Sequence, residues 1–230
     1  MNGQGKNPWA SFSGRAVIAP SLLACDFMRV GQQCRDVIDA GAEVLHVDIM
    51  DGHFVPNLSM GPGFCKSARA FTSHPLDVHL MVTDPAYYIE RFAEAGADSI
   101  TFHIEAAPKP GLLIERLRSL GLGVGITLRP GTAAETIFDY LPHVDMVLVM
   151  TVEPGYGGQS FMPDQLPKIQ AIRSRLLTHQ RLEVDGGITS RTAPLCRQAG
   201  ADTYVSGTDL FAAPNIREAV AQLRACVASG

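Results

Sequence analysis

The sequence predicts an α/β fold in a single domain, a (β/α)8 or TIM barrel, and three observations favour this class. The 230 residues are 46% hydrophobic and 18% charged, which is enough apolar material for one large core. Eight short apolar runs alternate with segments of helical periodicity, a pattern typical of parallel strands joined by helical crossovers. Similar segments recur at a spacing of roughly 53 residues, about two strand-helix units. An open, doubly wound sheet is the alternative.

The expected strands are the apolar runs themselves, taken in chain order. Because these runs contain few polar residues, they predict a parallel sheet that is covered on both faces. The runs are residues 17–19, 44–50, 76–82, 99–103, 123–128, 146–150, 182–184 and 203–205.

Helices are expected in the intervals between these strands. In residues 30–38 and 113–120, for example, apolar side chains recur at the spacing of an amphipathic helix. Three Ala-Gly-Ala sequences, around Gly41, Gly96 and Gly200, stand where a helix should end and a strand should begin. Glycine is the usual left-handed residue at a helix end, so each repeat marks a boundary.

Composition and charge limit the partners and the compartment. Residues 1–15 are rich in Gly, Asn and Ser and predict a flexible lead-in, which leaves residues 16–230 for the barrel. Nineteen basic and 23 acidic residues give a net charge of −4 without a basic stripe, which argues against nucleic acid as a partner. The longest apolar runs are about five residues, against the ~20 of a membrane helix, so no membrane association is expected. Five cysteines without a C-x-x-C pair favour the reducing cytoplasm.

Two histidines and two aspartates are placed to meet at one end of the predicted barrel. His46 and Asp48 lie on the same face of one strand because side chains alternate with a period of two, and His79 lies on the next strand. Asp185 ends a later strand. Buried carboxylates cost several kcal/mol per ion unless they are compensated, and a divalent cation supplies that charge. The four residues therefore predict a metal site; hydrogen-bonded core residues are the alternative.

Glycine-rich turns follow three consecutive strands and predict a phosphate site. Residues 154–158 contain Gly155, Tyr156, Gly157 and Gly158. The next two strands are followed by Gly186 and Gly187 and by Gly207 and Thr208. In barrels, phosphate is commonly held by the loops after strands seven and eight, where backbone N–H groups are accessible. Ordinary tight turns are the alternative.

The distribution of lysines disfavours two competing chemistries. The four lysines, Lys6, Lys66, Lys109 and Lys168, fall in the lead-in or in helices and loops, and none ends a predicted strand. A Schiff-base aldolase needs such an amine, and so does a decarboxylase that places lysine between two aspartates. Carboxylates and imidazoles without an amine favour proton abstraction next to a carbonyl that is held by a metal.

Five segments carry a resemblance to a known family. They are residues 19–23 (APSLL), 46–57 (HVDIMDGHFVPN), 79–82 (HLMV), 153–159 (EPGYGGQ) and 184–188 (VDGGI). These segments resemble the signature segments of ribulose-phosphate 3-epimerases, and the similarity runs from about residue 16 to the end of the chain. The motifs are long, so a chance match is improbable.

The resemblance implies an isomerase that interconverts D-ribulose 5-phosphate and D-xylulose 5-phosphate in pentose phosphate metabolism or carbon fixation. It implies that His46, Asp48, His79 and Asp185 ligate one divalent metal ion, zinc first, with iron, manganese or cobalt as alternatives. Asp48 and Asp185 are then the acid and base on opposite faces of C3. Asp48 is expected to act as the base in the D-ribulose 5-phosphate direction, with the enediolate charge offset by the metal.

Further residues follow from the same resemblance. Substrate contacts are expected from Ser21, His79, Gly155, Tyr156, Gly157, Gly158, Gly186, Gly187, Gly207 and Thr208. An apolar lid is expected from Met50, Met81 and Met150, where ordinary core filling is the alternative. The chain departs from many relatives at Thr208 and at Arg129.

Three further expectations concern substrate, catalysis and assembly. A six-carbon relative, D-allulose-6-phosphate 3-epimerase, shares the metal site and the chemistry and is the first alternative. A phosphosugar-binding barrel without catalysis is the second. The small phosphosugar is the expected partner, and a homo-oligomer is the expected assembly.

Overall fold

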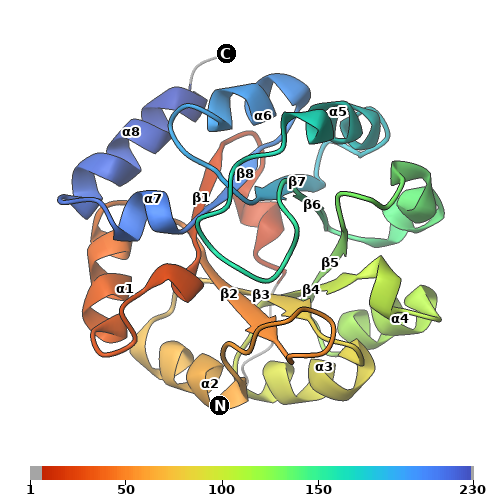
Figure 1. Cartoon of the computed structure of the whole chain (residues 1–230). Coiled ribbons are helices and arrows are strands. Elements are labelled where there is room, and N and C mark those ends of the chain that lie inside the picture. The colour runs from red at the N-terminus through yellow and green to blue at the C-terminus, as the bar shows by residue number, and fades with distance from the viewer. Residues whose placement is uncertain (1–6, 229–230) are drawn as a thin grey trace.

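Eight parallel strands form one barrel at the centre of the computed structural model, which describes residues 7–228 (Figure 1). From β2 to β8 each strand pairs with its sequence neighbours, β1 pairs with β8, and one isolated bridge between Ser21 and His46 joins the end of β1 to β2. The predicted barrel class is therefore confirmed. The strands are β1 (Val17–Pro20), β2 (Leu45–Met50), β3 (Leu76–Met81), β4 (Ser99–His103), β5 (Gly123–Leu128), β6 (Met146–Met150), β7 (Arg181–Asp185) and β8 (Thr203–Ser206).

Helices surround the barrel and follow the strands in order. Gly41, Gly96 and Gly200 have φ angles of 100°, 98° and 108° just after a helix end, as the repeats predicted. The α-helices are α1 (Val30–Asp39), α2 (Pro62–Phe71), α3 (Pro85–Glu94), α4 (Pro110–Ser119), α5 (Leu166–Arg173), α6 (Ala193–Ala199), α7 (Thr208–Phe211) and α8 (Ile216–Ala228). A single hydrophobic cluster extends through the strands and helices from Ile18 to Val227.

The connection between β5 and β6 differs from the expected α-helix. It is a 3-10 helix, η4 (Ala134–His143), and it contains Pro142. Proline has no N–H to donate and its ring clashes with the preceding turn, which disfavours a regular α-helix. The other 3-10 helices at the carboxyl ends of strands are η2 (Leu22–Ala24) and η3 (Ile104–Ala106), and η5 (Pro163–Gln165) precedes α5.

A short helix closes the amino-terminal end of the barrel. It is η1 (Trp9–Phe12), whose Trp9 and Phe12 side chains are buried. A Cβ on Gly123 would lie 3.1 Å from the Trp9 indole, so the missing side chain makes room for that ring. This part of the predicted flexible lead-in packs against the barrel, because two apolar side chains outweigh a polar composition. Residues 1–6 of the lead-in lie outside the described residues.

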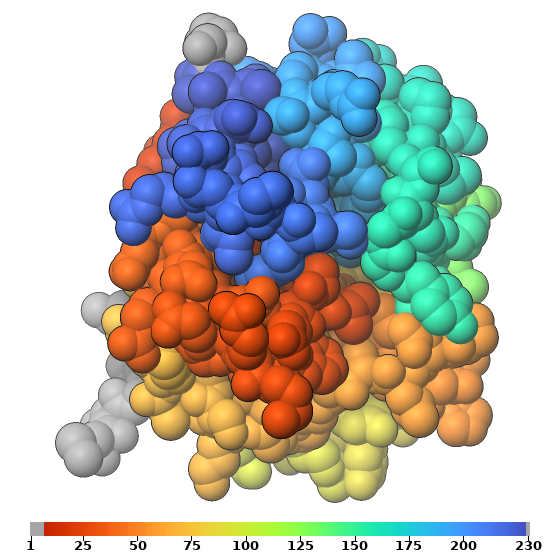
Figure 2. Space-filling model, turned by 60° about the vertical axis from the view of Figure 1, so that its left-hand side comes forward, coloured from red at the N-terminus to blue at the C-terminus, as the bar shows by residue number. Residues whose placement is uncertain are grey.

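Two contacts join segments that are distant in the sequence, one at the open end of the barrel beside the site and one on the outer surface. The segment that follows β6, teal in Figure 1, crosses in front of the barrel strands. It is held by the loop after β2, since Asn57 Nδ2 donates to the Gly155 carbonyl (2.7 Å) and the Tyr156 hydroxyl donates to the Pro56 carbonyl (2.6 Å). On the outside, α1 and α8 pack together, so early and late parts of the chain share one surface (Figure 2).

Two further features concern the helices and the cysteines. Within residues 7–228, no helix combines the length and the hydropathy that spanning a membrane requires. All five cysteines are free thiols in the described part of the chain.

Candidate metal centre and active site

The barrel brings the four predicted metal ligands together. His46 and Asp48 come from β2, His79 comes from β3, and Asp185 ends β7. One potential ligand atom from each lies within 4.8 Å of the others. The β2–β3 register pairs Asp48 directly with His79, which is why side chains from separate strands meet at one height.

Distances within this group fit a divalent cation. Nε2 of His46 lies 3.3 Å from Oδ1 of Asp48, and Nδ1 of His79 lies 3.1 Å from the same oxygen and 3.9 Å from Oδ2 of Asp185. His46 and His79 are fully buried, and Nε2 of His46 has no hydrogen-bond partner among the described residues. A buried ring nitrogen without a partner, facing two carboxylates, is the environment expected of a metal ligand.

The pKa values of the two carboxyl groups are shifted in opposite directions. Burial and the neighbouring Asp48 raise the pKa of Asp185 to about 6. Burial acts against ionisation of Asp48 as well, but His46 and His79 outweigh it and hold the pKa of Asp48 well below its usual range. Two carboxyl groups with opposite tendencies beside one cavity are typical of an acid and base pair.

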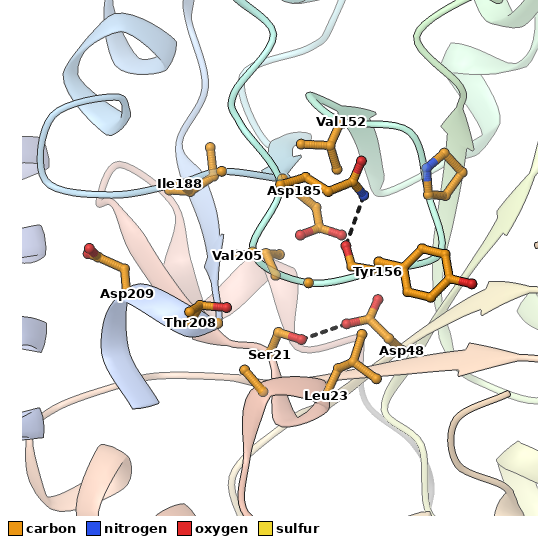
Figure 3. A pocket seen from close by; sticks show the side chains of 18 of the residues that line it. Ser21, Leu23, Asp48, Val152, Tyr156, Asp185, Ile188, Val205, Thr208 and Asp209 are labelled. Atoms are coloured by element: carbon orange, nitrogen blue, oxygen red, sulfur yellow. Dashed lines mark hydrogen bonds between the residues drawn. The ribbon is translucent and has the colours of Figure 1, made fainter. Parts of the chain in front are cut away.

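A cavity of about 480 Å³ opens above this group. Asp48 and Asp185 reach its wall from different sides (Figure 3), whereas the buried His46 and His79 lie deeper than the described residues that line it. The expected substrate contacts that line the cavity are Ser21, Gly155, Tyr156, Gly157, Gly158, Gly186, Gly187, Gly207 and Thr208. His79 is the one expected contact that the structure places beneath the wall.

Ser21 fixes the second oxygen of Asp48. The Ser21 hydroxyl donates to Oδ2 of Asp48 at 2.6 Å, as Figure 3 shows, while Oδ1 faces the two histidines. Ser21 also occupies the bridge that joins the end of β1 to β2. The orientation of the Asp48 carboxylate is therefore set from both sides.

The three methionines expected to form an apolar lid all line the cavity. Met50 and Met81 pack with Val55, and Met150 packs with Leu148 and Val152. Each lies at the carboxyl end of its strand. They make the wall near Asp48 and Asp185 apolar.

Close approaches of neighbouring atoms explain the two glycines after β7. Gly186 and Gly187 have φ angles of 119° and 64°. A Cβ on Gly186 would lie 2.5 Å from Val152, and one on Gly187 would lie 2.6 Å from the backbone nitrogen of Phe161. Any larger residue would displace the loop after β6.

Two departures from the family pattern have different surroundings. Thr208 lies on the cavity wall, and its Oγ1 is 3.7 Å from where a Cβ on Gly157 or Gly158 would stand. Arg129 belongs to the shell behind the site, because its guanidinium group lies over the Phe54 ring at 4.0 Å and donates to the Phe54 carbonyl at 2.6 Å.

Sequence reasoning did not anticipate the groups beneath the histidines. Asp77 accepts hydrogen bonds from Nδ1 of His46 (2.8 Å) and from the Ser99 hydroxyl (2.6 Å), which directs Nε2 of His46 toward the centre. Both oxygens of the buried Glu183 are without a hydrogen-bond partner among residues 7–228. Burial and the nearby Asp77 raise the pKa of Glu183 well above its usual range. The alternation of side chains along a strand could have indicated both residues. It puts Asp77 on the same face of β3 as His79, and Glu183 on the same face of β7 as Asp185.

Comparison with known proteins gives a consistent assignment. Residues 17–211 match the model of the ribulose-phosphate 3 epimerase family. A ribulose-phosphate 3-epimerase of Synechocystis sp. is 43% identical over 219 residues, covering 92% of this chain and 94% of the relative. The Bacillus subtilis protein of the same name is 40% identical over 211 residues, covering 90% and 97%. A rice relative named as a cytoplasmic isoform is 43% identical over 216 residues, covering 92% and 94%.

Solved structures support the fold at lower identity. A 3-hexulose-6-phosphate synthase has a TM-score of 0.70 at 15% identity and covers 92% of this chain and 100% of its own. An orotidine 5'-phosphate decarboxylase from Pyrococcus horikoshii has a TM-score of 0.69 at 17% identity, covering 92% and 99%. These likenesses bear on the fold alone, whereas the family match and the relatives near 40% identity cover nearly the whole chain. The chain therefore belongs to the ribulose-phosphate 3-epimerase family.

Proposed function

We propose that this chain is a ribulose-phosphate 3-epimerase, an isomerase that interconverts D-ribulose 5-phosphate and D-xylulose 5-phosphate. The observation that carries the proposal is the placement of Asp48 and Asp185. Two carboxyl groups with opposite pKa tendencies reach one cavity from different sides, with two buried histidines directly below. Inversion at a carbon next to a carbonyl requires a proton acceptor on one face and a donor on the other.

One divalent metal ion fits between His46, Asp48, His79 and Asp185. We propose zinc, with iron, manganese or cobalt as alternatives, since imidazole and carboxylate donors accept all four. When bound, the cation would offset the negative charge that develops on the substrate oxygens during proton abstraction.

Asp48 and Asp185 exchange roles with the direction of reaction. Starting from D-ribulose 5-phosphate, Asp48 removes the proton at C3 through Oδ2, the oxygen that the Ser21 hydroxyl positions, because Oδ1 faces the two histidines. Asp185 returns a proton to the opposite face, so the configuration at C3 inverts. Met50, Met81 and Met150 exclude water from this part of the cavity, which strengthens the electrostatic interactions there.

The substrate phosphate is proposed to bind along the glycine wall. Gly155–Gly158, Gly186, Gly187, Gly207 and Thr208 line the same cavity as the two aspartates, on the segments after β6, β7 and β8. Backbone N–H groups with no side chain in the way suit an anion. Thr208 replaces the serine of many relatives and keeps a hydroxyl there.

Two alternatives are not favoured. The six-carbon substrate D-allulose 6-phosphate would use the same chemistry, but the relatives compared above carry the pentose name. A barrel without catalysis is disfavoured because both carboxyl groups and both histidines are present and assembled. A homo-oligomeric state and a cytoplasmic location belong to the proposal as well.

A direct assay tests the function. Protein reloaded with zinc, iron, manganese or cobalt is assayed on D-ribulose 5-phosphate and on D-allulose 6-phosphate in heavy water, with product followed by NMR. We expect higher kcat/KM for the pentose substrate and deuterium at C3 of the product. Protein that binds sugar phosphate but epimerises neither substrate with any of the four metals would overturn the proposal.

A further inference from the structure

His79 is supported from behind by two side chains that the proposed reaction does not use. His103 ends β4, and its Nε2 lies 2.9 Å from Nε2 of His79. Nδ1 of His103 lies 3.2 Å from Oε2 of Glu105, which belongs to η3. The side chains form a chain of hydrogen bonds that leads from the candidate metal centre to the rim of the barrel.

Proton positions along this chain follow from its geometry. The nitrogens of His79 and His103 that face each other can share only one proton. Nδ1 of His79 faces the carboxylates, so a cation there requires its lone pair and places the ring proton on Nε2. His79 must then donate to Nε2 of His103, which leaves the proton of a neutral His103 on Nδ1, pointing at Glu105.

Glu105 is itself held in place. Its Oε1 accepts the backbone N–H of Arg129 at 2.8 Å and the Thr132 hydroxyl, both from the segment after β5. This leaves Oε2 for His103. The terminal acceptor of the chain is therefore fixed by a neighbouring loop.

Apolar and aromatic packing shields the chain from water. His103 is fully buried, and its ring stacks on His79 with centroids 5.0 Å apart and an interplanar angle of 26°. The Phe54 ring lies 4.7 Å from the His103 ring, and the Arg129 guanidinium group lies over the Phe54 ring. A water molecule has little access to replace His103 as the acceptor for His79.

We propose that His103 and Glu105 are positioning residues for the metal centre, which set the tautomer and the ring orientation of His79 so that Nδ1 faces the cation. The inference rests on the proposed function, because the metal ion is part of it. Hydrogen-bonded groups behind a metal-binding histidine typically change metal affinity 10–100-fold when they are removed. His46 has a simpler support of the same kind in Asp77.

Metal affinity of variant proteins tests the proposal. Metal-stripped protein is titrated with Co²⁺ and Zn²⁺ against a chelator, and the visible spectrum of the Co²⁺ form is recorded. His103→Phe keeps a ring but removes the acceptor, so we expect metal affinity to fall roughly 10–100-fold. His103→Gln restores an acceptor oxygen and should recover most of the loss. Glu105→Ala should weaken binding less than His103→Phe, and Glu105→Gln less again.

Matched controls separate this role from general effects. His74→Gln and Glu90→Gln change the same residue types outside the site, where His74 contacts Thr72 and Glu90 pairs with Arg116. Both should bind metal as wild type does. Unchanged Co²⁺ affinity and spectrum in a folded His103→Phe protein would overturn the inference.

Two further results keep the test decisive. If the variants do not fold, nitrogen NMR of the His79 ring in Zn²⁺-loaded wild type tests the proposal instead. Coordination through Nδ1 would support it, and coordination through Nε2 would contradict it. The proposed metal site fails separately, if wild type and His46→Gln bind Co²⁺ and Zn²⁺ equally weakly.

Discussion

Buried charged groups have partners at one end of the barrel and lack them at the other. At the amino-terminal end, Arg181 is 3% exposed, and its guanidinium group lies 3.1 Å from the Asp202 carboxylate. It also donates to the carbonyls of Phe12, Arg15 and Asp202 at 2.7–2.9 Å. The buried guanidinium charge at this end therefore has its partners within the protein, although the indole N–H of Trp9 there has no hydrogen-bond partner among the described residues.

At the carboxyl end, several buried polar atoms have no hydrogen-bond partner. Nε2 of His46 and both oxygens of Glu183 lack hydrogen-bond partners in the described chain, and Asp48 and Asp185 repel each other. Unsatisfied groups of this kind cost free energy unless a ligand completes them. In barrels of this class the amino-terminal face serves stability and the carboxyl face serves catalysis. The contrast therefore separates residues that should affect folding from residues that should affect activity.

The largest effects are expected from the two aspartates at the carboxyl end. Asp48→Asn and Asp185→Asn should each lower kcat/KM by roughly 10²–10⁴-fold, the usual contribution of a positioned acid or base. Metal-free Asp185→Asn should unfold at the same or a higher temperature than wild type, because the substitution removes a like charge beside Asp48. Steady-state assays and thermal unfolding with a chelator measure both. Mild losses of activity in both variants would contradict the assigned roles.

Arg181 tests the other end. Arg181→Met should lower the free energy of unfolding by about 1–3 kcal/mol, because it removes the donor to several carbonyls and one of the two guanidinium partners of Asp202, which keeps Arg173. The kcat/KM of the folded fraction should stay at the wild-type value. Urea unfolding gives the stability. Arg116→Met is the control, since the exposed Arg116–Glu90 pair should contribute less than about 1 kcal/mol. Equal stability of the two variants would contradict the comparison.

Gly187 tests the glycine wall. Gly187→Ala places a Cβ against the Phe161 backbone at a φ of 64°, so the loop after β6 must move. We expect KM for the sugar phosphate to rise roughly tenfold, equivalent to about 1.4 kcal/mol, with a smaller change in kcat. Gly131→Ala is the matched control, because a Cβ there meets nothing within 4 Å. A KM unchanged by Gly187→Ala would argue against phosphate binding at this wall.

The smallest effect concerns acid stability at Glu105. Burial alone would raise the pKa of this carboxyl, but hydrogen bonds from His103, Thr132 and the Arg129 backbone lower it from 4.5 to about 2. A carboxyl with a lowered folded-state pKa stabilises the fold above its unfolded pKa and loses that contribution as pH falls. Metal-free wild type should therefore exceed Glu105→Gln in stability near neutral pH, and the difference should shrink between about pH 4.5 and 2. Urea unfolding at several pH values measures the difference in unfolding free energy between the two proteins. A difference that grows as the pH falls would contradict the prediction.

Much of the barrel was predictable because strand and helix periodicities are local. The apolar runs matched the eight strands closely, and the glycines at 41, 96 and 200 marked helix ends since only their backbone geometry was needed. The connection through η4 was not predictable to this detail. Its expected α-helix depended on apolar spacing, which a 3-10 helix with Pro142 inside also satisfies.

By itself, the sequence determined which side chains share a face within one strand: His46 with Asp48, and Asp77 with His79, although the contact of Asp77 with His46 was not anticipated. Only the tertiary structure decided which strands stand at the same height, because the β2–β3 register is set by hydrogen bonds between strands. The contact of His103 with His79 and the packing of Trp9 beside Gly123 likewise join distant segments. Local periodicity carries no information about such distances, which depend on how the whole barrel closes.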